Sequence, residues 1–216
     1  MRLRAAVAGT AVLLLLLLSG APASAVAPPP GTYTYRIDHP DYGRIGTYSN
    51  RITREGDLTT VETQVRIAIK LAFVTVYRLE ADRRETWRDG RLVAYSGVME
   101  KNGKTTRIEG RAEGGRFVID GPKGRIVGPA GVWPANPWSP AIIDAEAIMA
   151  TATGRLYEPR IRNDGEDSIE VDGRRLPARH YAIVTREPHE IWFDSAGRLL
   201  RFTTVENGDV VTLSLQ

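Results

Sequence analysis

The chain has 216 residues, three histidines, no cysteine and a formal net charge of +3. The lack of cysteine excludes disulfides, a cysteine nucleophile and a lipid-modified N-terminal cysteine. Acidic and basic side chains are interspersed instead of clustered, which argues against nucleic acid as a partner.

Residues 1–25 have the three parts of a secretory signal peptide. Two arginines precede the apolar run Ala5–Leu18, and Ala23-Ser24-Ala25 forms a small-residue cleavage site. The apolar run is shorter than the ~20 residues that a membrane-spanning helix needs. We expect cleavage after Ala25 and a soluble periplasmic or secreted protein with no membrane-spanning segment. An uncleaved anchor is the alternative.

Residues 26–30 are expected to form an extended leader, and residues 31–216 a single antiparallel β domain. From Val61 to Phe73 the odd positions are mostly apolar and the even positions mostly polar. This period of two indicates a strand with one face toward a core and one toward water. Between Ala68 and Tyr77 both parities become apolar, so this segment is either a strand buried on both faces or a bend.

Turn signals recur along the chain. Strand-like runs are separated by Asp89-Gly90, Asn102-Gly103, Gly114-Gly115, Asn163-Asp164-Gly165, Asp172-Gly173 and Asn207-Gly208-Asp209. Such pairs are strong hairpin signals, and their spacing favours an antiparallel meander over alternating strands and helices. Gly43 and Gly46 indicate a bulge or a close backbone approach. The predicted fold is mainly β: a single curved antiparallel sheet or half-barrel.

One segment, Trp133–Gly154, departs from this pattern. Prolines at 134, 137 and 140 forbid a regular strand ladder, and the Ala-, Ile- and Met-rich stretch after them tolerates a helix. A short helix is therefore expected at about 140–153, with Ser139 as its N-cap and Pro140 as its first residue. Asp144 and Glu146 would lie near its positive end. We expect this Pro/Trp loop and helix to form a lid across the hollow of the sheet.

Several motifs together resemble the bacterial exported domain-of-unknown-function family 6134. They are Gly43-x-x-Gly46, Glu85-x-Trp87-x-Asp89-Gly90-x-Leu92, Asn102-Gly103-Lys104, Asn136-x-Trp138, Gly173 with Ala178-Arg179-His180-Tyr181, and Ile191-Trp192-Phe193-Asp194-x-x-Gly197-x-Leu199. Phe193 stands where the family pattern leads us to expect Tyr. The resemblance spans residues 31–215. It implies export and fold but no chemistry, and in outline the predicted fold is similar to periplasmic lipid and lipoprotein carriers.

The polar candidates for chemistry are few. His39, His180 and His189 lack the spacing of a metal pair on one element, so structural roles are expected, with no metal and no cofactor. An acid–base site would require His39 and His180 to meet near Asp38 or Asp41. The residues 163–167 are expected to form an acidic surface turn, with calcium binding as the alternative. No motif for a nucleophile or phosphate loop occurs, and we predict that the protein is not an enzyme.

An apolar ligand is the function that the sequence favours. Trp133 and Trp138 form either a plug of the core or the lip of a cavity. We expect a lipid or acyl-chain site lined by six residues: Trp133, Trp138, Ile142, Ile143, Met149 and Phe73. A structural or interaction protein of the envelope with a filled core is the second hypothesis, and a histidine-dependent enzyme the third. Trp192 is predicted to be core, so that Trp192→Ala would cost ~3–5 kcal/mol.

Overall fold

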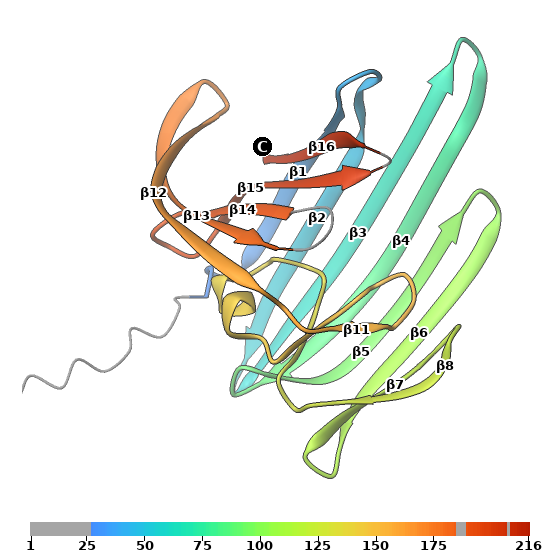
Figure 1. Cartoon of the computed structure of the whole chain (residues 1–216), viewed down its shortest axis with the longest axis vertical. Helices are drawn as coiled ribbons and strands as arrows, with labels where there is room; N and C mark the ends of the chain where they lie inside the picture. The colour runs from blue at the N-terminus through green and yellow to red at the C-terminus, as the bar shows by residue number, and fades with distance from the viewer. Residues whose placement is uncertain (1–26, 185–188, 207) are drawn as a thin grey trace, which may run out of the picture.

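The computed structural model describes residues 27–184, 189–206 and 208–216. Within these ranges, thirteen antiparallel strands form one curved sheet that remains open as a half-barrel (Figure 1). A second, three-stranded sheet lies inside its curve. The mainly β, antiparallel half-barrel that the sequence predicts is therefore confirmed. The predicted signal peptide lies outside the described residues.

Two meanders make up the large sheet, in the order β12-β13-β14-β15-β16-β1-β2-β3-β4-β5-β6-β7-β8. The first meander consists of β1 (Gly31–His39), β2 (Gly43–Glu55), β3 (Leu58–Leu71), β4 (Val74–Arg88), β5 (Arg91–Lys101), β6 (Lys104–Glu113), β7 (Arg116–Gly121) and β8 (Gly124–Gly128). The second consists of β12 (Ile161–Val171), β13 (Arg174–Ile183), β14 (His189–Phe193), β15 (Leu199–Glu206) and β16 (Asp209–Leu215). Pairing of β16 with β1 joins the two meanders.

Strand parity places the core on the concave face. Along β3, Val61, Thr63 and Val65 are buried, whereas the even positions between them point outward. Both features predicted from Gly43 and Gly46, a bulge and a close backbone approach, are present. The register slips by one residue opposite Ile37, and a Cβ on Gly46 would collide with the backbone of Arg66 in β3. Only glycine allows β2 and β3 to approach this closely.

The predicted Asp-Gly, Asn-Gly and Gly-Gly hairpin turns are confirmed. Asp89, Asn102 and Asp172 have φ of 50°, 49° and 48°, and each is followed by a glycine that also has positive φ. This is the geometry of two-residue turns whose twist matches that of paired strands. The prediction for Asn163-Asp164-Gly165 is wrong, because these residues form a bulge within β12 and not a turn. Residue 207 lies outside the described residues.

Neither alternative for residues 68–77 is correct. The strand β3 ends at Leu71, and Ala72 and Phe73 form the turn into β4. Leu71 and Phe73 are exposed instead of facing the core. Residues 68–77, which carry apolar side chains at both odd and even positions, therefore form the tip of a hairpin that extends past the neighbouring strands (Figure 1).

Residues 129–160, here called the crossing segment, connect β8 to β12 through the inside of the half-barrel. The crossing segment contains β9 (Val132–Pro134), the 3-10 helix η1 (Pro140–Asp144), β10 (Ala147–Met149) and β11 (Leu156–Tyr157). The predicted helical insertion is thus reduced to five residues, and Ala147–Met149 in its second half form a strand. Main-chain pairing of β10 with β9 and β11 outweighs the helix propensity of its alanines.

The helix start is as predicted, although the helix is short. The Ser139 side chain accepts a hydrogen bond from the backbone N–H of Ala141, and Pro140 occupies the first turn. Asp144 closes η1 and Glu146 lies beyond it, so neither carboxylate lies at the positive end of a helix as expected. Residues 27–30 are tethered to the sheet, because Arg54 donates to the carbonyl of Pro28 and Tyr33 to that of Pro29.

The prediction that Trp192 is core is wrong. Its neighbours Ile191 and Phe193 are buried on the concave face, so Trp192 points to the opposite face and is half-buried. Its ring stacks on His180 with 4.4 Å between centroids, and its indole N–H donates to Asp167 at 2.8 Å. The strict alternation of a strand explains the error, since three consecutive apolar residues cannot all face one side.

Candidate functional site

Three tryptophans fix the crossing segment to the concave face. Trp133 and Trp138 come from the crossing segment and Trp87 from β4, and all three are buried. The ring centroids of Trp87 and Trp133 are 4.1 Å apart, and those of Trp133 and Trp138 are 5.5 Å apart. Aromatic rings at these separations bury large areas and hold each other's orientation. Trp133 and Trp138, the two tryptophans predicted to lie at the site, therefore act as a plug of the core.

A buried carboxylate lies beside this tryptophan cluster. Glu85 is fully buried on the concave face, two residues before Trp87 in β4. Its carboxylate accepts hydrogen bonds from the indole N–H of Trp87 and from that of Trp138, both at 3.0 Å. A third bond comes from the Asn136 side-chain amide at 2.8 Å. Three donors from two distant parts of the chain thus converge on one acidic group.

Asn136 extends this network across the sheet. Its side-chain oxygen accepts from the Tyr48 hydroxyl at 2.6 Å and from the Asn50 amide at 3.1 Å. Its side-chain nitrogen donates to Thr63 at 3.1 Å in addition to Glu85. All of these side chains are buried, so each bond is made in a low-dielectric setting where an unmade one would be costly. The network explains why the polar residues Asn50 and Thr63 occupy core-facing positions.

Burial raises the pKa of Glu85 to about 7, against the opposing effect of the donors Asn136, Trp87 and Trp138 and of the Arg83 charge. Removal of an ionised carboxylate from water is unfavourable, and hydrogen bonds to it recover only part of that cost. A group with this pKa changes charge near neutral pH. The hydrogen bonds that hold the crossing segment therefore depend on protonation.

An apolar cavity of about 620 Å³ lies between the crossing segment and the strands β13, β14 and β15. Six of its lining residues are Pro137, Ile142, Ile148, Tyr157, Ile183 and Phe202. Its polar groups include His189 and Glu158. The His189 ring stacks on Phe202, with 5.8 Å between centroids. A mostly apolar hollow of this size with a few polar groups is typical of a small-molecule site.

The six predicted site residues are only partly brought together. Ile142 lines the apolar cavity, whereas Met149 is fully buried in the core and Ile143 packs half-buried against it. Trp133 and Trp138 border a smaller hollow of about 290 Å³ near Arg54 and Asp57. Phe73 lies at the exposed β3–β4 tip and lines none of these hollows.

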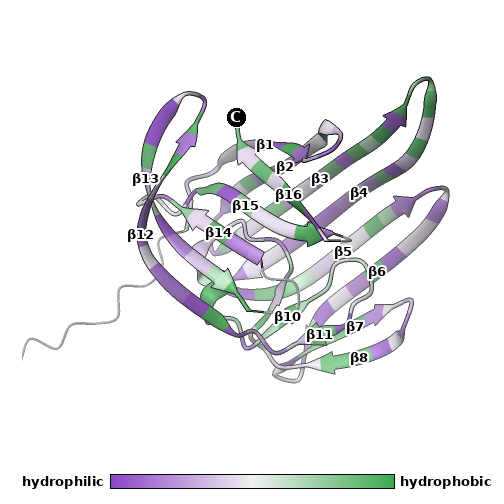
Figure 2. Ribbon diagram, turned by 45° about the horizontal axis from the view of Figure 1, so that its top comes forward, coloured by the Kyte–Doolittle hydropathy of each residue, from purple (hydrophilic) through white to green (hydrophobic). Residues whose placement is uncertain are grey.

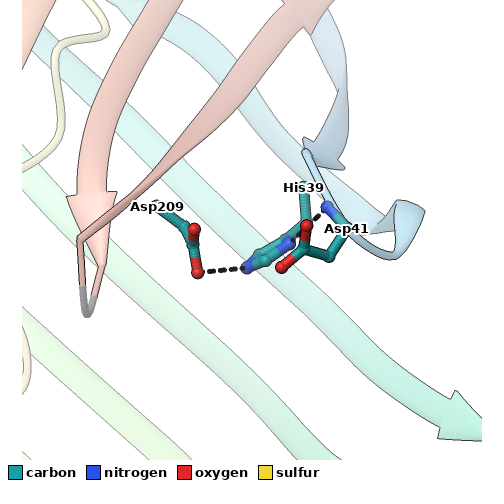
Figure 3. Close-up of side chains that lie close together, drawn as sticks. All are labelled: His39, Asp41 and Asp209. Atoms are coloured by element: carbon teal, nitrogen blue, oxygen red, sulfur yellow. Dashed lines mark hydrogen bonds and ion pairs between the residues drawn. The ribbon is translucent and has the colours of Figure 1, made fainter.

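His39 lies in a small polar cluster at the start of the β1–β2 turn (Figure 3). Its Nδ1 accepts the backbone N–H of Asp41 at 3.2 Å, so the neutral ring carries its proton on Nε2. That nitrogen faces the Asp209 carboxylate at 3.6 Å. A metal would need the lone pair of Nε2, so this arrangement favours a hydrogen bond or ion pair over ligation.

His180 belongs to a separate cluster on the outward face of β13. Its Nε2 contacts Glu190, and its Nδ1 lies 3.8 Å from Asp164, which in turn pairs with Arg162. The two carboxylates approach opposite nitrogens of one ring, as ion-pair partners do. His39 and His180 do not share a cluster, so the acid–base site that required their meeting is not assembled.

Sequence reasoning missed the polar residues at the centre of this site. Glu85, Asn136, Tyr48, Asn50 and Thr63 were not among the predicted site residues. A signal was available, because Glu85-x-Trp87 and Asn136-x-Trp138 are two of the family motifs. Their common purpose is visible only when the crossing segment is placed against β4.

The fold and site define an open antiparallel half-barrel whose hollow is crossed by an anchored tryptophan segment. The family described as domain of unknown function DUF6134 matches residues 35–216. The chain belongs to this family, which confirms the resemblance drawn from its motifs. No curated protein matches it.

Among solved structures, the fold is shared by a β-barrel-like protein of the DUF1849 family from Brucella abortus. The TM-score is 0.61 at 10% identity, over 88% of this chain and 97% of that one. A DUF1089-family protein from Pseudomonas aeruginosa (13% identity, 85% and 89% covered) and LprF from Mycobacterium bovis (12%, 86% and 83%) reach a TM-score of only 0.30. The first likeness shows the fold alone, and the other two do not establish a common one.

Proposed function

We propose that this protein is exported and binds an apolar molecule, a lipid or an acyl chain, without transforming it chemically. The single observation that carries the proposal is the apolar cavity of about 620 Å³ between the crossing segment and β13–β15. Export is inferred from the signal-peptide pattern of residues 1–25. Among the described residues, no helix is long and apolar enough to cross a membrane.

The walls of the cavity come from two rigid sources. One wall is the sheet itself, through Ile183 and Phe202. The other wall is the crossing segment, which the tryptophans and the Glu85–Asn136 bonds hold in place. A preformed apolar cavity binds with less loss of conformational entropy than a collapsed one. His189 and Glu158 are polar groups that can contact the head of an amphipathic ligand.

The test is retention of lipid by the purified protein. We expect native mass spectrometry, after incubation with envelope lipids, to detect a bound species that extraction identifies as acyl-chain lipid. Ala135→Trp places a large ring at the cavity wall and should weaken binding about ten-fold or more. Ala94→Trp adds the same ring to the exposed face of β5 and serves as the matched control.

Two outcomes would overturn the proposal. One is a protein that retains no lipid under any loading condition, which would favour a structural role in the envelope. The other is equal retention by the Ala135→Trp and Ala94→Trp variants, because binding would then lie elsewhere.

A further inference from the structure

The tip of the β3–β4 hairpin carries a cluster of exposed apolar side chains. The exposed fractions are 52% for Leu71, 103% for Phe73, 64% for Val74 and 48% for Val76. In Figure 2 the tip is coloured hydrophobic while the strands below it alternate. These four residues, here called the apolar tip, comprise Phe73 in the turn and three residues at the adjoining ends of β3 and β4. Single exposed apolar residues are normal, but a contiguous group at a protruding end calls for a function.

The turn itself departs from the chemistry of four other tight hairpins. Those at 89–90, 102–103, 114–115 and 172–173 use Asp-Gly, Asn-Gly or Gly-Gly. Here Ala72 adopts a positive φ of 54° and Phe73 follows it. An alanine in this conformation is strained, and glycine or asparagine would relieve the strain. The chain thus places apolar side chains at a position where a polar turn would be more stable and more soluble.

Basic side chains surround the base of the apolar tip. Lys70 lies three residues before Phe73, and Lys101 and Lys104 flank the adjacent β5–β6 turn. That turn is held against β4 by hydrogen bonds between Asn102 and the backbone of Arg78. Within the described residues, the three lysines have no ion-pair partner. Lys101 lies 5.4 Å from the ring of Tyr77.

Acidic groups are absent from this end of the hairpin. No Asp or Glu occurs from residue 67 to residue 79. The nearest are Glu80, which is paired with Arg78 at 2.6 Å, and Glu100, which lies opposite Glu80 on β5. These two acidic groups face four basic ones, namely Arg78 and the three lysines. The net charge around the apolar tip is therefore positive. An apolar tip above a basic collar is complementary to an anionic bilayer, whose hydrocarbon lies beneath negative headgroups.

We propose that the apolar tip inserts into the surface of a membrane that contains anionic phospholipid. The strand rises roughly 7 Å from Phe73 to Thr75, which is opposite Lys70, and roughly 13 Å to Tyr77, beside which Lys101 lies. These two lysines are therefore at headgroup level when Phe73 reaches the acyl chains. The inference goes beyond ligand binding and does not depend on the cavity. It gives the protein a means of residing at a lipid surface without a membrane-spanning helix among its described residues.

The first experiment places a reporter on the apolar tip. The Phe73→Trp variant of residues 26–216 is compared with the unsubstituted protein, and the difference between their emission spectra gives the fluorescence of the new tryptophan. This fluorescence should shift to the blue when vesicles with 30% phosphatidylglycerol in phosphatidylcholine are added. Lipids brominated on the acyl chain should quench that emission. Vesicles of phosphatidylcholine alone should produce a much smaller change. A blue shift that appears with rising protein concentration in the absence of lipid would overturn the proposal in favour of self-association.

The second experiment measures binding by vesicle co-sedimentation. Phe73→Ser should weaken binding to the anionic vesicles about ten-fold, because one aromatic side chain no longer leaves water. Val127→Ser, at a half-exposed apolar position on β8, should bind as wild type does. Lys70→Gln with Lys101→Gln should weaken binding to anionic vesicles only, and 0.5 M salt should have the same effect. Equal binding by the Phe73→Ser and Val127→Ser variants would refute insertion of the tip.

Lipid retention in the cavity by Phe73→Ser should remain at the wild-type level.

Discussion

Trp87→Ala should lower the free energy of unfolding by ~3–5 kcal/mol, the largest effect expected of any single truncation in the tryptophan cluster. The residue is buried, its ring contacts both Trp133 and Trp138, and its N–H is one of three donors to Glu85. Truncation leaves a cavity and also weakens the stabilisation of a buried carboxylate. Urea denaturation followed by circular dichroism measures the change.

Trp192→Ala provides the matched comparison. It removes the same type of side chain at a position on the outward face. There the ring stacks on His180 and is only half-buried. We expect a loss of roughly 1–2 kcal/mol, because less apolar area returns to water. Equal losses for the two variants would show that the crossing segment contributes little to stability, and the anchoring role assigned to the Trp87 cluster would be wrong.

Stability should fall as the pH rises from about 4.5 to 7, through Glu85. The folded-state pKa of about 7 lies above the unfolded value near 4.5, so in this window the folded chain holds a proton that the unfolded chain has lost. The contribution is fully present below pH 4.5, decreases between pH 4.5 and 7 while only the unfolded chain is ionised, and levels off above pH 7, where the folded chain is ionised too. The total change is about 3 kcal/mol, at 1.36 kcal/mol per pKa unit.

Glu85→Gln isolates this contribution from that of every other titrating group. The variant is expected to be less stable than the wild type at low pH, since an amide cannot accept hydrogen bonds from all three donors. Its glutamine side chain does not ionise. Between pH 5 and pH 8 the wild type should therefore lose about 3 kcal/mol more than the variant. Parallel stability profiles for the two proteins would show that the pKa of Glu85 is not raised.

The predicted fold depended on patterns that are local in the chain. The alternation along β3 and the turn pairs at 89–90, 102–103 and 172–173 predicted strands, hairpins and an antiparallel sheet, all of which are confirmed. Gly46 was also readable, because a glycine within a strand marks close backbone approach. These features follow from residues that are neighbours in sequence or directly paired.

The errors arise where residue character was weighed without the strand arrangement. The length of η1 was overestimated because helix propensity was weighed without the strand partners of Ala147–Met149. Trp192 was assigned to the core because apolar character was weighed without the parity set by Ile191 and Phe193. Phe73 was assigned to the hollow because nothing local shows that β3 ends two residues earlier. Strand pairing overrode a local preference in the first case, strand alternation was overlooked in the second, and the end of the hairpin decided the third.

The sequence alone determined most strands of the large sheet, most of their turns, the antiparallel class and the family. Only the tertiary structure decided that Asn136 and Trp138 meet Glu85 across more than fifty residues, that a cavity remains beside the crossing segment, and that Phe73 projects at a free tip. The reason is physical. Strand periodicity and turn geometry are written in neighbouring residues, whereas the burial of a charge and the exposure of an apolar side chain depend on what the rest of the chain places beside them.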